Sequence, residues 1–391
     1  MRVALISIAG QPREAGRDAP FAVAGKTLAQ RQLEFVLAAG SERVIALGDG
    51  ASTEAVALRQ GAEGAGARFD VMRDGHRLLG ALGASDELLV LAPGVLADSP
   101  AAMDMLAKGN KVLVLPAASG IPAGFERIDL ERAWAGALLI PGSLVERLSE
   151  LPDDFEPTAA LLRVALQARM REVRLPDELM ADGSWAKVGD EETTGSRDEA
   201  WLRRNLMPAP TKAVSPWLAR TSLNLFAAPL LSAHRAMAGV IAAVAVLLAL
   251  AVGVSFYGLI SLGFGLVALG ALSSELAAGL VRLRHAPFPK SRKRIWALLP
   301  ASVDLGLAAC ATLAIDGDWL HRLFPALILL GSLHAGRLSE RTDWSALLGD
   351  RALLAAVLAV AALFGLAEPA IMLAAAVAIA LNVMNSRPQS G

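Results

Sequence analysis

Two acidic residues stand inside long apolar segments, and this position makes them the first candidates for chemistry. Glu275 ends a stretch of 39 residues without a charged side chain, and Asp304 lies in the next apolar segment. An acid held at membrane depth is costly, and is therefore a functional candidate by default. The two carboxylates could hold one Mg²⁺ or Mn²⁺ ion and accept a proton from a hydroxyl group. The alternative is an ion pair or hydrogen bond between helices, for example of Asp304 with Arg282 or His334.

Basic residues follow Glu275 closely. On a helix, Glu275, Gly279 and Arg282 share one face, so Arg282 can pair with Glu275. The basic segment 282–294 can bind a phosphate group, or it can simply fix the topology and touch anionic lipid. Its candidate phosphate-binding residues are Arg282, Arg284, Lys290 and Arg292.

The apolar segments that carry these residues predict a bundle of membrane-spanning helices. About 20 apolar residues are needed for one crossing. Six spans are expected, over about 236–254, 257–281, 296–315, 322–338, 350–366 and 369–385. The basic loop after the second span and the acidic loop after the third place both termini in the cytoplasm. We therefore expect a multi-pass protein of the cell (inner) membrane.

Residues 201–235 are predicted to be a linker followed by an interfacial amphipathic helix. Its residues Trp217, Leu218, Leu225 and Phe226 would then face lipid. A helix packed on the protein's own bundle is the alternative. The second predicted span contains "GLISLGFGLVALG", whose small residues suit close helix contact and a possible homodimer.

Residues 1–200 have the pattern of a soluble α/β domain. Charge divides the chain, with 23 Lys and Arg against 30 Asp and Glu in residues 1–210, and 14 against 8 in the remainder. Short apolar runs ("RVALISI", "RVIAL", "ELLVLAP", "KVLVLP") alternate with amphipathic segments such as "TLAQRQLEFVLAAG". Such alternation predicts a mostly parallel sheet covered on both faces. Cys310 is the single cysteine, which excludes intramolecular disulfides and Cys-based metal sites.

The segment "FAVAGKTLAQRQLEFVLAAGSERVIAL" resembles the sugar- and polyol-phosphate nucleotidyltransferases, in which a Gly-rich loop precedes a Pro-Val-x-Gly-Lys-like turn. The resemblance implies a Rossmann-like cytoplasmic domain and nucleotide-binding roles for Gly10, Arg13 and Lys26. Pro12 replaces a loop residue that would offer an N–H to phosphate. Lys187 and Gly189 stand where the family has carboxylates for Mg²⁺.

The order of the domains resembles the bifunctional polyol-phosphate cytidylyltransferase/CDP-alcohol phosphotransferase family, which makes inositol-phosphate-type lipid precursors. Its membrane domain would occupy residues 236–391 and would displace CMP from a CDP-alcohol. Asp304 is the one family aspartate that remains. The other motif positions carry Gly270, Ser273, Ser274, Ala277, Ala278, Pro300 and Ala308.

Three functions follow from these patterns. The first is a CDP-alcohol phosphotransferase-like enzyme of phospholipid or sphingolipid head-group synthesis with a degenerate active site. The second is a non-catalytic pseudoenzyme that scaffolds or regulates a lipid-synthesis enzyme. The third is a lipid or small-solute carrier. Membrane lipids and a CDP-alcohol or nucleotide are the expected partners, and no nucleic acid is expected.

Overall fold

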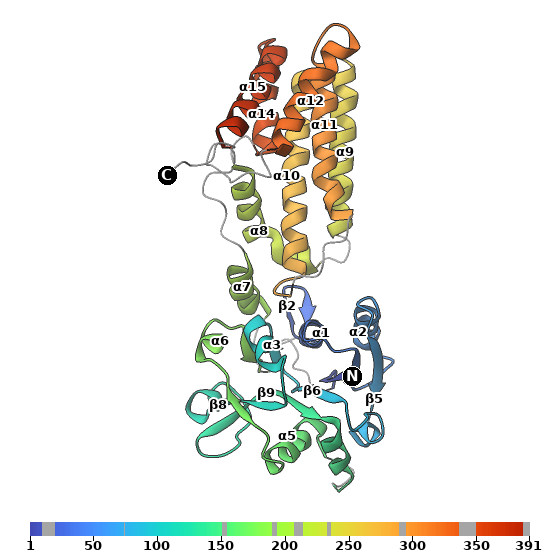
Figure 1. Cartoon of the computed structure of the whole chain (residues 1–391), viewed down its shortest axis with the longest axis vertical. Coiled ribbons are helices and arrows are strands. Elements are labelled where there is room, and N and C mark those ends of the chain that lie inside the picture. Colours follow the sequence, from blue (N-terminus) through green and yellow to red (C-terminus); the bar gives the residue numbers. More distant parts are fainter. Residues whose placement is uncertain are drawn as a thin grey trace. The chain divides into compact units, whose positions relative to one another are not determined.

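The computed structural model describes residues 1–9, 20–73, 75–150, 155–189, 194–206, 214–232, 236–288, 295–335 and 349–385. It divides the chain into two compact units, Met1–Asn205 and Leu206–Gly391 (Figure 1). The first unit is an α/β domain, and the described part of the second is helical. The sequence placed a linker from residue 201, whereas a helix of the first unit continues to Asn205.

A mixed seven-stranded sheet forms the centre of the first unit, in the order β10-β8-β9-β6-β1-β4-β5. β9 is antiparallel to both of its neighbours, and the other pairs are parallel. A ribbon pairs β11 with β7, and a hairpin pairs β2 with β3. The strands are β1 (Arg2–Ser7), β2 (Ala22–Val23), β3 (Lys26–Thr27), β4 (Arg43–Leu47), β5 (Arg68–Met72), β6 (Glu87–Leu91), β7 (Val95–Ala97), β8 (Lys111–Pro116), β9 (Arg132–Pro141), β10 (Glu172–Arg174) and β11 (Trp185–Lys187).

Burial along the strands explains why the four apolar runs became strands. Consecutive residues are buried over Val3–Ser7, Val44–Leu47 and Leu88–Leu91. Since neighbouring side chains on a strand point to opposite faces, such continuous burial means that both faces of the central sheet are covered. The mostly parallel sheet expected from the sequence is confirmed, and the antiparallel β9 is an addition to it.

Helices and short 3₁₀ turns connect these strands. Thr27 begins the first helix with a capping box, in which its hydroxyl accepts from the backbone N–H of Gln30 at 3.2 Å and the Gln30 side chain accepts from the Thr27 N–H. Gly40, with a φ of +85°, follows the C-cap of that helix. The helical segments are α1 (Leu28–Ala38), α2 (Thr53–Glu63), η1 (Gly75–Leu78), α3 (Pro100–Leu106), α4 (Ala117–Gly120), η2 (Gly142–Glu150), α5 (Pro157–Gln167), α6 (Asp177–Ala181) and α7 (Thr194–Asn205).

In the described part of the second unit, helices overlap all six predicted spans and follow a lead-in helix, but the six-span bundle is not confirmed. Two helices are long and apolar enough to cross a membrane, over Met237–Phe256 and Ile260–Arg284. Only 17% of the apolar window of the first of these is buried, so it is not the enclosed core helix of a soluble fold. The helices are α8 (Val214–Ser232), α9 (Ala236–Phe256), α10 (Ile260–Arg284), α11 (Ile295–Leu313), α12 (Trp319–Ala335), α14 (Arg351–Leu363) and α15 (Ala367–Asn385).

The small residues at the start of α10 are used for contact within the chain. A Cβ atom at Gly263 would lie 1.9 Å from Ser255 Oγ and 3.0 Å from the Ala251 carbonyl oxygen, both on α9. Gly270 is similarly close to Leu248 of α9. These glycines therefore allow α9 and α10 to approach closely, which is the role that small residues have in membrane helix pairs.

We expect Gly263→Ala to lower the stability of the helical unit by about 1–3 kcal/mol, because the new methyl group overlaps α9. Gly265→Ala is the matched control, since a Cβ there meets nothing within 4 Å. It should be neutral or slightly stabilising, because alanine favours helix. The measurement is the temperature at which buried Cys310 becomes reactive to a maleimide dye in detergent micelles. Equal midpoints for the two variants would contradict the close α9–α10 contact.

Helix α8 packs on the bundle along one stripe and leaves its other face exposed. One stripe, which includes Ala219, Leu223 and Ala227, is buried, and a Cβ at Gly279 of α10 would lie 2.4 Å from Leu223 Cδ1. The opposite face leaves large apolar side chains exposed. They include the four predicted from the sequence: Trp217, Leu218, Leu225 and Phe226.

Candidate functional site

Asp304 lies in the interior of the helical unit and is paired. It is 4% exposed on α11, and its Oδ1 accepts a hydrogen bond from Arg351 Nε at 2.8 Å. The His334 Nδ1 atom is 3.8 Å from the other carboxylate oxygen, but most of the His334 side chain is exposed. Arg351 is also buried, and its Nη1 donates to the Gly349 carbonyl oxygen at 3.0 Å. The ion pair proposed as the alternative for Asp304 is therefore present, with Arg351 as the principal partner.

The residue before Arg351 joins two further elements. Asp350 is the N-cap of α14, where its side chain accepts from the Leu353 N–H at 3.1 Å. It also accepts from the Ser215 N–H at 2.7 Å and from the Ser215 hydroxyl at the start of α8. Asp350 and Arg351 together connect α8, α11 and α14, which indicates a structural junction. An Asp before an apolar run is an N-cap signal in the sequence, but it does not identify the partners.

Glu275 does not join this junction. Its side chain is exposed on α10, and it makes no hydrogen bond or ion pair in the part of the chain that the structure describes. The expected pairing with Arg282 is wrong, because Arg282 Nε donates to the Ala278 carbonyl oxygen of its own helix at 3.3 Å. Glu275 lies off the buried stripe of α10, whose small residues face neighbouring helices.

The remaining predicted phosphate ligands are dispersed. Arg282 and Arg284 are exposed at the end of α10, and Lys26 forms an ion pair with Glu34 at 2.6 Å. The other four candidates lie outside the described residues. They are Gly10, Arg13, Lys290 and Arg292.

Across the described ranges, no group of three or more His, Cys, Asp or Glu side chains is placed to hold a metal ion. Asp304 Oδ1 accepts a hydrogen bond from the Arg351 guanidinium group, and the Glu275 side chain is exposed. A site for Mg²⁺ needs several oxygen ligands in near-octahedral geometry.

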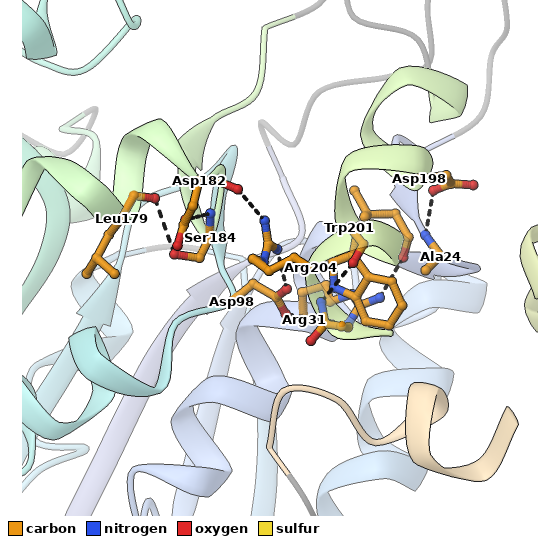
Figure 2. Close-up of polar contacts among 11 residues, drawn as sticks. Ala24, Arg31, Asp98, Leu179, Asp182, Ser184, Asp198, Trp201 and Arg204 are labelled. Carbon is orange, nitrogen blue, oxygen red and sulfur yellow. Dashed lines mark hydrogen bonds and ion pairs between the residues drawn. The ribbon is translucent and has the colours of Figure 1, made fainter. Parts of the chain in front are cut away.

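In the α/β unit, Asp98 is enclosed by cations. It follows β7, is 2% exposed, and accepts from Arg204 Nη2 at 2.8 Å and from Arg31 Nη1 at 3.5 Å (Figure 2). The Arg31 guanidinium lies 4.4 Å from the Trp201 ring centroid. Burial raises the pKa of Asp98, and the two guanidinium groups offset part of that rise. Burial likewise lowers the pKa of Arg31.

The residues of Figure 2 come from separate elements and hold α7 on the α/β unit. Arg204 Nη1 donates to the Asp182 carbonyl oxygen at 2.8 Å, and the Ala24 N–H donates to Asp198 Oδ1 at 2.6 Å. Arg31 Nη2 donates to the Val23 carbonyl oxygen at 2.9 Å. Sequence reasoning missed this cluster, because its charged residues lie far apart in the chain and no local spacing pairs them.

A second group of titratable residues lines a cavity of about 120 Å³ in the same unit. The cavity begins where β6 ends, and ligands of open α/β sheets bind at the carboxyl ends of the strands. Lys187 lines it and donates to the Pro93 carbonyl oxygen. The lining residues are Ala92, Pro93, Val95, Phe125, Glu126, Trp134, Gly136, Glu156, Thr158 and Lys187.

Comparison with known proteins adds no relative to this description. No protein-family model matches the chain, and no curated protein sequence matches it. The fold and the sites define an α/β domain joined to a helical unit with two helices of membrane-spanning length and composition.

Proposed function

We propose that this protein is a membrane-embedded, non-catalytic relative of the CDP-alcohol phosphotransferases that serves as a scaffold or regulator of a lipid-synthesis enzyme. The observation that carries the proposal is the Asp304–Arg351 pair. The one acid retained from the family motif is engaged in a buried ion pair between helices instead of facing a metal ion or a substrate hydroxyl. A transferase of this class needs carboxylates that are open to metal and substrate.

Further support comes from Glu275 and from the α/β unit. Glu275 is exposed and therefore does not complete a site with Asp304. In the α/β unit, Lys187 brings a positive charge to the position where nucleotidyl transfer needs a metal ligand. The mixed sheet supports the nucleotidyltransferase-like fold, and we propose that the unit retains this fold without its activity.

The membrane part of the proposal follows from the helices. The two helices of membrane-spanning length, together with the shorter helices of the described part of the unit, support the proposal. We propose that all six form a membrane bundle in the cell (inner) membrane, with both termini in the cytoplasm. The exposed aromatic face of α8 would lie at the membrane surface, beside the basic end of α10.

The test is release of CMP by the purified full chain in lipid nanodiscs, with CDP-diacylglycerol, a panel of alcohols and Mg²⁺ or Mn²⁺. We expect no release above that of empty nanodiscs, and no change on Glu275→Gln or Asp304→Asn. Deleting the gene should still alter the lipid profile, and Glu275→Gln should restore that profile, because the exposed side chain is not needed for folding. Metal-dependent release that chelation stops and Asp304→Asn abolishes would establish a transferase instead.

A further inference from the structure

The cavity beside β6 is built from fixed elements and contains charges of both signs. Lys187 comes from β11, Glu156 is the N-cap of α5, and Glu126 precedes β9. The Lys187 side chain runs past two turn glycines, since a Cβ at Gly94 would lie 3.4 Å from Lys187 Nζ and one at Gly124 would lie 3.5 Å from its Cγ. The hydrogen bond from Lys187 Nζ to the Pro93 carbonyl oxygen holds the ammonium group at the cavity wall.

Burial disfavours the charged forms of the two groups that line the cavity. It lowers the pKa of Lys187, while the charges of Glu126 and Glu156 oppose that change. Burial also raises the pKa of Glu126, and Glu156 adds to the rise, while the charges of Lys187 and Arg163 oppose it. A ligand that brings an opposite charge to each group would therefore stabilise both charged forms.

The polar groups differ in what they leave available to a ligand. The Glu156 carboxylate already accepts from Thr158 Oγ1 at 2.8 and 2.9 Å and from the Ala159 N–H at 2.5 Å. The Glu126 carboxylate makes no hydrogen bond or ion pair within the described residues. Lys187 uses one N–H on Pro93 and has two more, because an ammonium group carries three donors. The cavity thus offers an acceptor on Glu126 and donors on Lys187.

The rest of the wall is apolar and rigid. Phe125 and Trp134 are 5% and 2% exposed, and the Trp134 indole N–H donates to the Ala137 carbonyl oxygen at 3.2 Å, which fixes the ring. A volume of about 120 Å³ suits a molecule the size of a small amino acid and is well below the roughly 300 Å³ at which drug-sized pockets begin. A divalent ion is disfavoured here because the Lys187 ammonium already lies beside both carboxylates.

From this arrangement we propose that the cavity binds a small zwitterion, with its ammonium group on Glu126, its carboxylate or phosphate group on Lys187, and its carbon chain against Phe125 and Trp134. Each charged end then meets an opposite charge in a partly desolvated site, where such hydrogen bonds are strongest. The inference stands on the α/β unit alone and does not depend on the proposed function of the helical unit.

The experiment is isothermal titration calorimetry of the full chain in lipid nanodiscs with two zwitterions, L-serine and O-phosphoethanolamine. Both carry an ammonium group, but L-serine has a carboxylate where O-phosphoethanolamine has a phosphate. The comparison therefore shows which anionic group the cavity binds. We expect saturable binding of at least one, with a Kd below about 1 mM. Ethanolamine lacks the anionic end and glycolate lacks the ammonium end, so each should bind at least about tenfold more weakly.

Variants assign the binding to the cavity. Glu126→Gln and Lys187→Met should each weaken binding about tenfold or more, while the exposed controls Glu131→Gln and Lys108→Met should not. Because Glu126 lies at the cavity mouth, its substitution tests the site even if Lys187→Met fails to fold. Binding should weaken as the pH falls through the raised pKa of Glu126, because the protonated carboxyl no longer attracts an ammonium group.

Three results would overturn the proposal. They are no saturable binding of either zwitterion up to about 10 mM, equal binding of ethanolamine or glycolate, and unchanged binding by Glu126→Gln. None of them bears on CMP release, so failure here is distinguishable from failure of the proposed function.

Discussion

Arg351→Met is expected to destabilise the helical unit by about 3–5 kcal/mol, because it leaves the Asp304 carboxylate buried without its cation. His334 cannot take over this role, since its Nδ1 is 3.8 Å away and its side chain is largely exposed to solvent or lipid. The same substitution also removes the hydrogen bond from Arg351 Nη1 to the Gly349 carbonyl oxygen at the start of α14. The loss should appear as an earlier reaction of Cys310 with a maleimide dye on heating in detergent micelles.

The double variant Asp304→Asn, Arg351→Met separates ion pairing from packing. It contains neither charge, so it should recover most of the stability that Arg351→Met alone loses. Arg282→Met is the matched control, because Arg282 is exposed and bonds only to its own helix among the described residues. A wild-type midpoint for Arg351→Met would show that the pair is not structural. Asp304 would then be free for chemistry, and the transferase interpretation would gain support.

Part of the central sheet could be predicted from the sequence. Four strands were predictable, because runs such as "RVALISI" are apolar on consecutive residues, which indicates burial on both faces. The longest strand, β9, was not predicted, although its sequence "RAWAGALLIP" is equally apolar. Its antiparallel direction depends on the path of the chain around it, and a short apolar run does not distinguish strand from helix. Gly136, at φ +80° against Val95, obscures the pattern further.

A buried ion pair at Asp304 could be predicted from the sequence, but the identity of its partner could not. Burial of Asp304 and the possibility of an ion pair followed from one acid in an apolar segment. Arg351 lies 47 residues further along the chain, and the spacing of residues on one helix says nothing about which helix packs beside it. Glu275 was expected near Asp304. Spacing along α10 shows which residues share a face of that helix, but it does not show which face is buried, and Glu275 lies outside the buried stripe.

Asp98→Asn should destabilise the α/β unit by about 3–5 kcal/mol, since it leaves the guanidinium groups of Arg31 and Arg204 without their buried counterion. Asp177→Asn is the matched control. It removes an exposed ion pair with Arg174, and such pairs contribute about 0–1 kcal/mol. The two substitutions delete the same charge in the same unit, so their difference isolates the effect of burial.

Hydrogen exchange on the full chain shows which segments lose stability in Asp98→Asn. In Asp98→Asn, the amides of α7 and of the β2–β3 hairpin should exchange faster, because the buried charges hold α7 against the rest of the unit. Arg204→Met should have a smaller effect, since it leaves Arg31 and Asp98 paired at 3.5 Å and Arg31 on the Trp201 ring. Wild-type exchange of α7 in Asp98→Asn would mean that apolar packing of Trp201 and Leu202, rather than the charge cluster, holds the helix.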